Sequence, residues 1–189
     1  MRALSRKSLP EMQVIFMHGP AASGKHTIAS LLSGLTGLPL FHNHLAVDTA
    51  LSLFEFGTPG FRNIRAAIWR AAFQEAARSS RSFIFTFHPE ASVEPTLVGE
   101  LVALIEVVGG TVRFVELICA HETTIERLGN PSRGKFRKLT DPDLYRQLEK
   151  QGAFLHPPLP TPLVRVNTTE LTPQAAADRI AKAIAGACA

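Results

Sequence analysis

The 189-residue sequence contains only two cysteines and no apolar run of the length that crosses a membrane. A bilayer span needs about 20 consecutive apolar residues, so the sequence predicts no transmembrane helix. Cys119 and Cys188 cannot form a disulfide framework, which favours a reducing, cytoplasmic compartment. Residues 1–10 carry three basic side chains but no apolar segment follows them, so we interpret them as a tail and not as a signal peptide.

Acidic residues are missing from one segment, residues 127–140, which holds five of the 20 Lys and Arg residues. This local concentration predicts a basic lid that binds an anion, and argues against a general nucleic-acid surface despite the formal net charge of +4. A solvated basic loop is the alternative. Hydrophobic residues make up 46% of the chain and charged residues 19%, as in globular proteins, and residues 11–189 are expected to form a single domain.

Apolar, strand-like runs alternate with helical patterns along the chain. Alternation of this kind predicts βαβ units, and hence an α/β fold of three layers, α/β/α, around a five-stranded parallel sheet. Asp141 and Thr172 each precede a proline and are expected to cap a helix. The expected strands are residues 13–17, 39–41, 82–87, 112–119 and 163–166, and the expected helices are residues 25–36, 46–56, 61–78, 93–108, 123–128, 141–150 and 173–187.

Residues 19–27, with the sequence GPAASGKHT, follow the first apolar run and open an amphipathic helix. Glycines let the backbone wrap around a phosphate chain, N–H groups at the helix N-terminus attract the negative charge, and a lysine reaches the β- and γ-phosphates. The segment therefore predicts a P-loop, or Walker A motif, and ATP as the ligand; a glycine-rich turn that binds nothing is the alternative. The expected nucleotide-binding residues of this loop are Gly19, Ala22, Ser23, Gly24, Lys25, His26 and Thr27.

Four polar side chains, His42, Asn43, His44 and Asp48, follow the expected second strand. Phosphoryl transfer needs a positioned nucleophile, and a base at this place would orient or deprotonate an acceptor hydroxyl. His44 and Asp48 are spaced so that both lie on one face of a helix. Local capping and turn formation is the alternative, and two histidines without a clear third ligand indicate a zinc site only weakly.

The expected helix 61–78 has two faces. Ile64, Ala67, Ile68 and Ala71 share the face that we expect in the core. The opposite face carries Arg62, Arg65, Trp69 and Phe73, a mixture of cations and rings that could hold an anionic or ring-containing acceptor. Packing of the rings against the preceding helix, with solvated arginines, is the alternative.

Together these residues resemble the small P-loop kinases of the nucleoside-monophosphate-kinase-like fold, in particular shikimate-kinase-like and chloramphenicol-phosphotransferase-like proteins. The resemblance extends from about residue 13 to residue 184 and is strongest at residues 19–27. It implies that Arg127 lies beside adenine and that Arg133 is a lid arginine that stabilises the transferred charge.

For the acceptor, the resemblance implies that His44 stands near the family's acidic residue, with Asp48 one turn further on. It implies that Arg62 or Arg65 holds an anionic group of the acceptor. Asn167 and Thr168 look like the loop that touches adenine, largely through backbone atoms.

Three departures from the family pattern concern the metal and the acceptor. His26 replaces the serine or threonine that normally meets Mg²⁺. Thr27 and Asp48 are the expected metal ligands; contact of Thr27, one position later, with the α-phosphate is the alternative. The third strand lacks the aspartate often found at its end, and Glu90 is the nearest carboxylate. The glycine-rich acceptor segment of shikimate kinases is missing, which argues against shikimate as the substrate.

The expected function is an ATP- and Mg²⁺-dependent phosphotransferase that transfers the γ-phosphoryl group to a hydroxyl of a small anionic or ring-containing metabolite. Lys25, His44, Asp48 and Arg133 are the expected catalytic residues, and a monomer or homodimer without nucleic acid or membrane partners is expected. A nucleotide-binding regulatory protein, with His26 leaving hydrolysis weak, is the alternative. Nucleic-acid binding through the basic segment is a third possibility and predicts a steep salt dependence.

Overall fold

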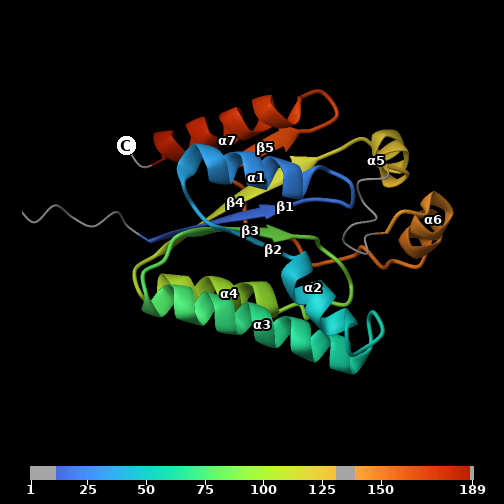
Figure 1. Ribbon diagram of the computed structural model, residues 1–189, viewed down its shortest axis with the longest axis horizontal. Coiled ribbons are helices and arrows are strands. Elements are labelled where there is room, and N and C mark those ends of the chain that lie inside the picture. The colour runs from blue at the N-terminus through green and yellow to red at the C-terminus, as the bar shows by residue number, and fades with distance from the viewer. Residues whose placement is uncertain (1–11, 131–138, 188–189) are drawn as a thin grey trace, which may run out of the picture.

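A computed structural model describes residues 12–130 and 139–187 of the protein. Its centre is a five-stranded parallel sheet with the strand order β2-β3-β1-β4-β5 (Figure 1). The predicted α/β fold with a five-stranded parallel sheet is confirmed. The strands are β1 (Gln13–His18), β2 (Leu40–His42), β3 (Phe83–Phe87), β4 (Thr111–Ile118) and β5 (Val164–Asn167).

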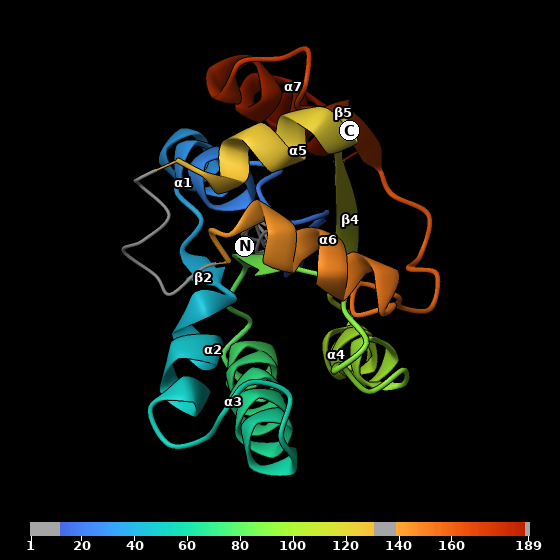
Figure 2. The same ribbon diagram turned by 90° about the vertical axis from the view of Figure 1, so that its right-hand side faces the viewer.

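Helices cover both faces of the sheet. Two of them, α1 and α7, lie on one face, and α3 and α4 lie on the other (Figure 1). The short helices α5 and α6 lie at the edge where the strands end (Figure 2). The helices are α1 (Lys25–Thr36), α2 (His44–Leu51), α3 (Pro59–Arg78), α4 (Leu97–Glu106), α5 (His121–Leu128), α6 (Pro142–Lys150) and α7 (Pro173–Gly186).

The central strand β1 carries apolar side chains on both faces because helices cover both faces of the sheet. Val14 and Phe16 belong to the hydrophobic cluster beneath α3 and α4, whereas Ile15 and Met17 belong to the cluster beneath α1 and α7. Successive side chains of a strand point to opposite faces of the sheet, so this nearly unbroken apolar run is typical of a buried parallel strand. The two clusters hold the sheet in place and leave its carboxyl edge for loops.

Two helices depart from the sequence prediction by four or more residues at one end. The second helix ends at Leu51 instead of residue 56, and the chain turns through Gly57, which has a φ of 78°, before Thr58 caps α3. The fourth helix begins at Leu97 instead of residue 93, because Pro95 disfavours helical backbone at the residue before it. The expected caps are confirmed: Asp141 accepts hydrogen bonds at the start of α6 and Thr172 does so at the start of α7.

The expected core face of α3 was wrong. Ala67 and Ala71 are exposed, and the buried stripe is the one that carries Arg65, Trp69 and Phe73. The rings of Trp69 and Phe73 meet the Phe85 ring of β3 edge to face, with centroid distances of 5.7 and 5.2 Å. Large aromatic rings bury far more apolar surface than alanines do, so the helix turns this stripe toward the sheet and takes Arg65 with it.

Among the residues that the structure describes, none of the helices combines the length and apolar character that crossing a bilayer requires.

Candidate functional site

The loop between β1 and α1 is built on backbone conformations that require glycine. Gly24, with a φ of 84°, stands in left-handed geometry immediately before α1. Gly19 packs so closely on β4 that a Cβ atom there would lie 2.4 Å from the carbonyl oxygen of Leu117. Side chains at either position would strain the turn or collide with the sheet, so the glycines fix the path by which the loop enters the helix.

Lys25 is the first residue of α1 and reaches back over this loop. Its Nζ donates hydrogen bonds to the carbonyl oxygens of Gly19, at 2.8 Å, and Pro20, at 2.6 Å. The ammonium group therefore lies above the turn whose N–H groups and helix N-terminus attract anions. This is the arrangement that phosphate binding by a P-loop requires.

The loop forms one wall of a cavity of about 820 Å³. The cavity is lined by segments that follow the strands and by the short helices near them. They include loop and helix residues from Ala21 to Ile28, the α2 residues His44, Val47 and Leu51, the segment after β3, Arg127 of α5, the α6 residues Leu144 and Leu148, and Thr168 after β5.

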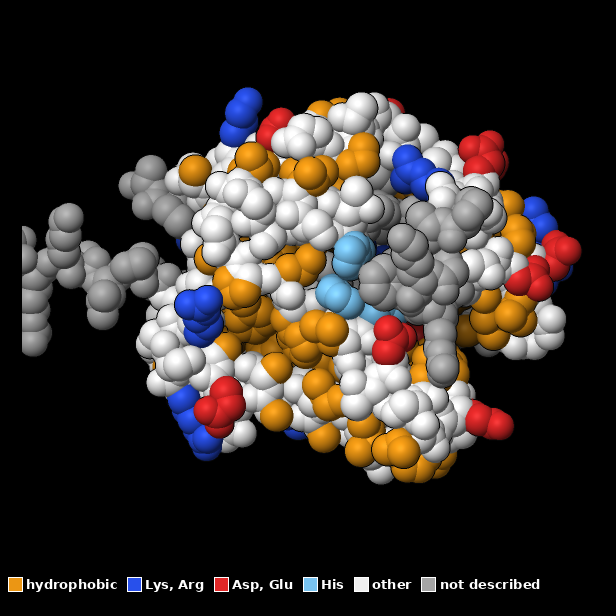
Figure 3. Space-filling view, in the orientation of Figure 1, with side chains coloured by type: hydrophobic (Ala, Val, Ile, Leu, Met, Phe, Trp, Pro, Cys, Tyr) orange, Lys and Arg blue, Asp and Glu red, His pale blue; other side chains and the backbone are white. Residues whose placement is uncertain are grey.

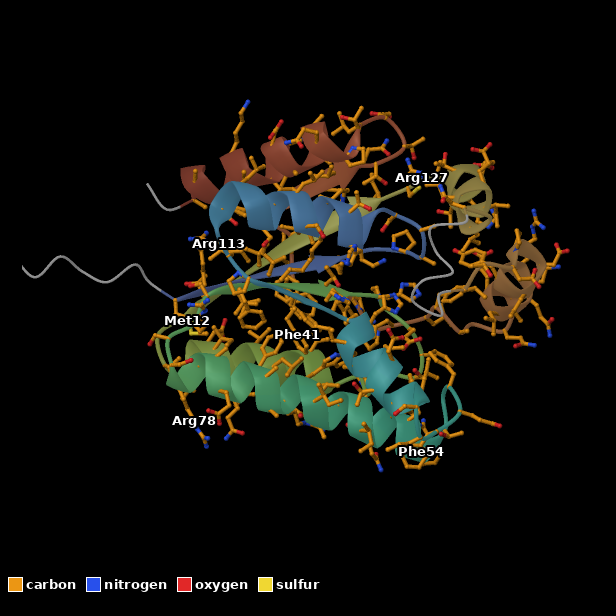
Figure 4. All side chains as sticks on the ribbon, in the orientation of Figure 1. Met12, Phe41, Phe54, Arg78, Arg113 and Arg127 are labelled. Carbon is orange, nitrogen blue, oxygen red and sulfur yellow. The ribbon has the colours of Figure 1, made fainter. Side chains whose placement is uncertain are left out.

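One end of the cavity lies between α5 and the start of α7, where Figure 4 shows Arg127. The guanidinium of Arg127 donates to the carbonyl oxygen of Thr168, at 2.7 Å, and also faces its hydroxyl, at 3.4 Å. These contacts hold Arg127 and Thr168 together on the cavity wall. Asn167 does not line the cavity; its side chain bonds Glu170 and the amide of Thr169.

The other end of the cavity is formed by residues after β2 and β3. Asn43 and His44 line it, and the backbone N–H of Asn43 donates to the Thr86 hydroxyl at 3.1 Å. His42 and Asp48, which the sequence groups with them, are not among the lining residues. The rings of His26 and His42 meet edge to face at 4.9 Å, and histidine side chains gather beside hydrophobic ones on this face of the molecule (Figure 3).

A carboxylate that was not among the predicted site residues, Glu90, also lines this end of the cavity. It forms a buried ion pair with Arg65 through Oε1, and the same oxygen accepts a hydrogen bond from Ser92 at 3.0 Å. Burial raises the pKa of Glu90 above its ordinary value, and the neighbouring Arg65 charge opposes that shift. The rule that ligands bind beyond the carboxyl ends of parallel strands selects residues 88–90, which include Glu90, three residues after β3.

Arg65 lies behind Glu90 and is 1% exposed. Its guanidinium stacks on the rings of Phe61 and Trp69, 5.0 Å from each centroid, and donates to the Ser92 carbonyl oxygen at 2.9 Å. Neither Arg65 nor the exposed Arg62 lines the cavity. These two arginines were predicted to bind an anionic group of the acceptor, but neither of them contacts the cavity in this structure. The predicted lid arginine, Arg133, lies outside the described residues.

One of the two predicted magnesium ligands lines the cavity. No group of three or more His, Cys, Asp or Glu side chains in residues 12–130 and 139–187 is arranged to hold a metal ion. His26 occupies the P-loop position of the usual hydroxyl ligand, and Mg²⁺ prefers oxygen ligands. Thr27 lines the cavity and Asp48 does not, so Thr27 is the better placed of the two predicted ligands.

Several solved structures of kinases share this fold. A sugar kinase from a Janibacter species superposes with a TM-score of 0.63 at 21% identity, covering 95% of this chain and 99% of that one. A gluconokinase from Sinorhizobium meliloti gives 0.64 at 15% identity, covering 95% of each chain. A shikimate kinase from Aquifex aeolicus gives 0.53 at 18% identity, covering 92% and 97%.

At these identities the likeness establishes the fold alone: the chain has the P-loop, shikimate-kinase-like fold. Neither a protein-family profile nor a curated sequence matches it. The resemblance predicted from residues 19–27 is thereby confirmed at the level of architecture.

Proposed function

We propose that the protein is a kinase-type phosphotransferase that transfers the γ-phosphoryl group of ATP to a hydroxyl of a small molecule. The observation that carries this proposal is that one cavity brings together the P-loop with Lys25 and, on another wall, Glu90, Asn43 and His44. A phosphate-binding loop facing hydrogen-bonding side chains across a shared cavity is what transfer between two small molecules requires.

The nucleotide would occupy the part of the cavity between the P-loop and Arg127. Backbone N–H groups of residues 21–27 and the N-terminus of α1 would hold the phosphates. Lys25 would exchange its two carbonyl partners, Gly19 and Pro20, for phosphate oxygens. Arg127 and the Thr168 backbone would flank the adenine, a role that the fixed contact between them supports.

The acceptor hydroxyl would lie beside Glu90. Its oxygen attacks the γ-phosphorus, the bond from that phosphorus to the bridging oxygen breaks, and the negative charge leaves on ADP. The hydroxyl proton passes to Glu90 Oε2, because the Arg65 and Ser92 hydrogen bonds occupy Oε1. His88, two residues earlier, contacts the Gly19 carbonyl oxygen at 3.2 Å, so this segment runs beside the P-loop. Asn43 and His44 would orient the acceptor from α2.

A direct test is incubation with ATP, Mg²⁺ or Mn²⁺, and a panel of small alcohols, followed by mass spectrometry of the products. We expect a phosphate monoester to form together with one ADP per product. Tight ATP binding without transfer to any alcohol would instead favour a nucleotide-binding regulatory protein.

The pH dependence of the transfer reaction tests the role of Glu90. A base must be ionised to accept a proton, so kcat/KM should rise with pH through the raised pKa of Glu90, above that of an ordinary carboxyl. Replacing Glu90 with glutamine should remove this acid limb and lower kcat by about 10²-fold. Glu94→Gln, an exposed carboxylate outside the cavity, is the matched control and should leave the profile unchanged. An acid limb that survives in Glu90→Gln would assign the base to another residue.

A further inference from the structure

We propose that the acceptor of this site is an uncharged, largely apolar hydroxyl compound and not an anionic metabolite. This inference rests on the proposed phosphotransferase function and names its substrate class. It is carried by the cations of the cavity, by the Arg65–Glu90 pair and by the apolar part of the cavity lining.

Two cations of the described residues line the cavity, and the proposed function assigns both to the nucleotide. Of the Lys and Arg residues in 12–130 and 139–187, Lys25 and Arg127 alone are among the lining residues. Lys25 lies over the P-loop, and Arg127 is held against Thr168 at 2.7 Å and faces Cys119 Sγ at 3.6 Å. With ATP bound, its phosphates would engage Lys25, so a negatively charged acceptor beside Glu90 would meet the negative charge of the phosphates there.

Arg65 lies behind the part of the cavity that Glu90 lines, but the carboxylate of Glu90 neutralises its charge. Arg65 is enclosed between Phe61 and Trp69 and pairs with Glu90, which itself faces the cavity. A carboxylate or phosphate on the acceptor would approach the carboxylate of Glu90 first, and like charges at a desolvated contact disfavour binding. The pair thus presents a hydrogen-bond acceptor to the ligand and no free positive charge.

Much of the remaining lining of the cavity is apolar. It includes Val47 and Leu51 of α2, Phe56 of the following turn, Leu148 of α6, and Phe154. Phe56 is 57% exposed although its ring packs on Phe61 at 4.8 Å, so a bound apolar ligand would cover surface that now faces solvent. Asn43, His44, Thr86 and His88 add polar groups to the same lining.

The test uses pairs of acceptors that differ only in charge: hydroxy acids and their methyl esters, such as 4-(hydroxymethyl)benzoate and methyl 4-(hydroxymethyl)benzoate. The assays are run at about pH 8, above the ordinary pKa of an imidazole. We expect kcat/KM to be at least about tenfold higher for the ester than for the acid, because like-charge contact penalises the acid. An acid that is used as well as its ester, or better, would overturn the proposal.

Binding of the same pairs to protein loaded with a non-hydrolysable ATP analogue separates this inference from the proposed function. Selective binding of the esters without any phosphoryl transfer would support the acceptor class and refute the kinase. Equal binding of acids and esters, or binding of neither, would refute the acceptor class.

A matched pair of phenylalanines locates the binding. Phe56 lines the cavity, whereas Phe54 lies outside it, beside the start of α3 (Figure 4). Phe56→Ala should weaken ester binding by about tenfold through lost apolar contact, and Phe54→Ala should leave it unchanged. Equal effects of the two substitutions would place the ester outside this cavity and overturn the proposal.

Discussion

Replacing Lys25 with alanine is expected to lower kcat for phosphoryl transfer by about 10³-fold, since the substitution removes a preorganised positive charge from the developing charge on the phosphates. The same substitution should weaken ATP binding. In the structure the Lys25 ammonium lies over the loop, bonded to the Gly19 and Pro20 carbonyl oxygens. The measurement is steady-state kinetics together with ATP titration by calorimetry.

Lys182→Ala provides the matched control for this substitution. Lys182 is an exposed lysine of α7 outside the cavity, so its removal changes the net charge by the same amount without touching the phosphates. Its kinetics and ATP affinity should match those of the unaltered protein. A Lys25→Ala protein that is folded and fully active would exclude residues 19–27 as the nucleotide site.

The second large effect concerns stability. Replacing Arg65 with methionine should lower the free energy of unfolding by about 3–5 kcal/mol, because it leaves the buried Glu90 carboxylate without its partner. The double replacement Arg65→Met/Glu90→Met removes both charges and should cost less than the single one. Urea denaturation of the single and double variants at neutral pH measures the difference. A double variant that loses the sum of the two single effects would contradict a coupled pair.

The pH dependence of the Arg65→Met variant gives an independent check with a definite sign. Without Arg65, burial raises the pKa of Glu90 further above its value in the unfolded chain, so the folded state favours the protonated form. Stability from that proton is present below the unfolded pKa and is lost as the pH rises through the folded pKa. The variant should therefore be closer to the unaltered protein at acidic pH than at neutral pH. A destabilisation independent of pH would indicate a packing defect instead.

The fold was predictable because its signals are local. The apolar strands, the helices that begin at a proline and the loop of residues 19–27 can each be recognised from a short stretch of sequence. All five strands were predicted to within one residue at either end. The orientation of α3 was not predictable in the same way, because a helix with two plausible faces does not itself indicate which one meets the sheet. Burial of Arg65 depends on Glu90, 25 residues away in the sequence, and on the phenylalanines of β3.

The two ends of the cavity also differ in how far the sequence predicts them. The P-loop end follows from one continuous segment. The acceptor end is assembled from α2, the segment after β3 and the residues around α6, so that Val47, Glu90 and Phe154 meet only through the tertiary fold. The density of polar residues after the second strand led to the prediction of His42, Asn43, His44 and Asp48. Of these, Asn43 and His44 line the cavity, together with Glu90. The catalytic assignments of His44, Asp48 and Arg133 stay predictions.

The proposed transfer of a phosphoryl group from ATP to an alcohol in this cavity is tested most directly by single-turnover ³¹P NMR with excess protein, Mg²⁺, ATP and a mixture of neutral primary alcohols. The γ-phosphate resonance should be replaced by a phosphate monoester resonance while ADP appears in equal amount. Bound ATP that stays intact, or a γ-phosphate that appears only as inorganic phosphate, would contradict the proposed phosphotransferase.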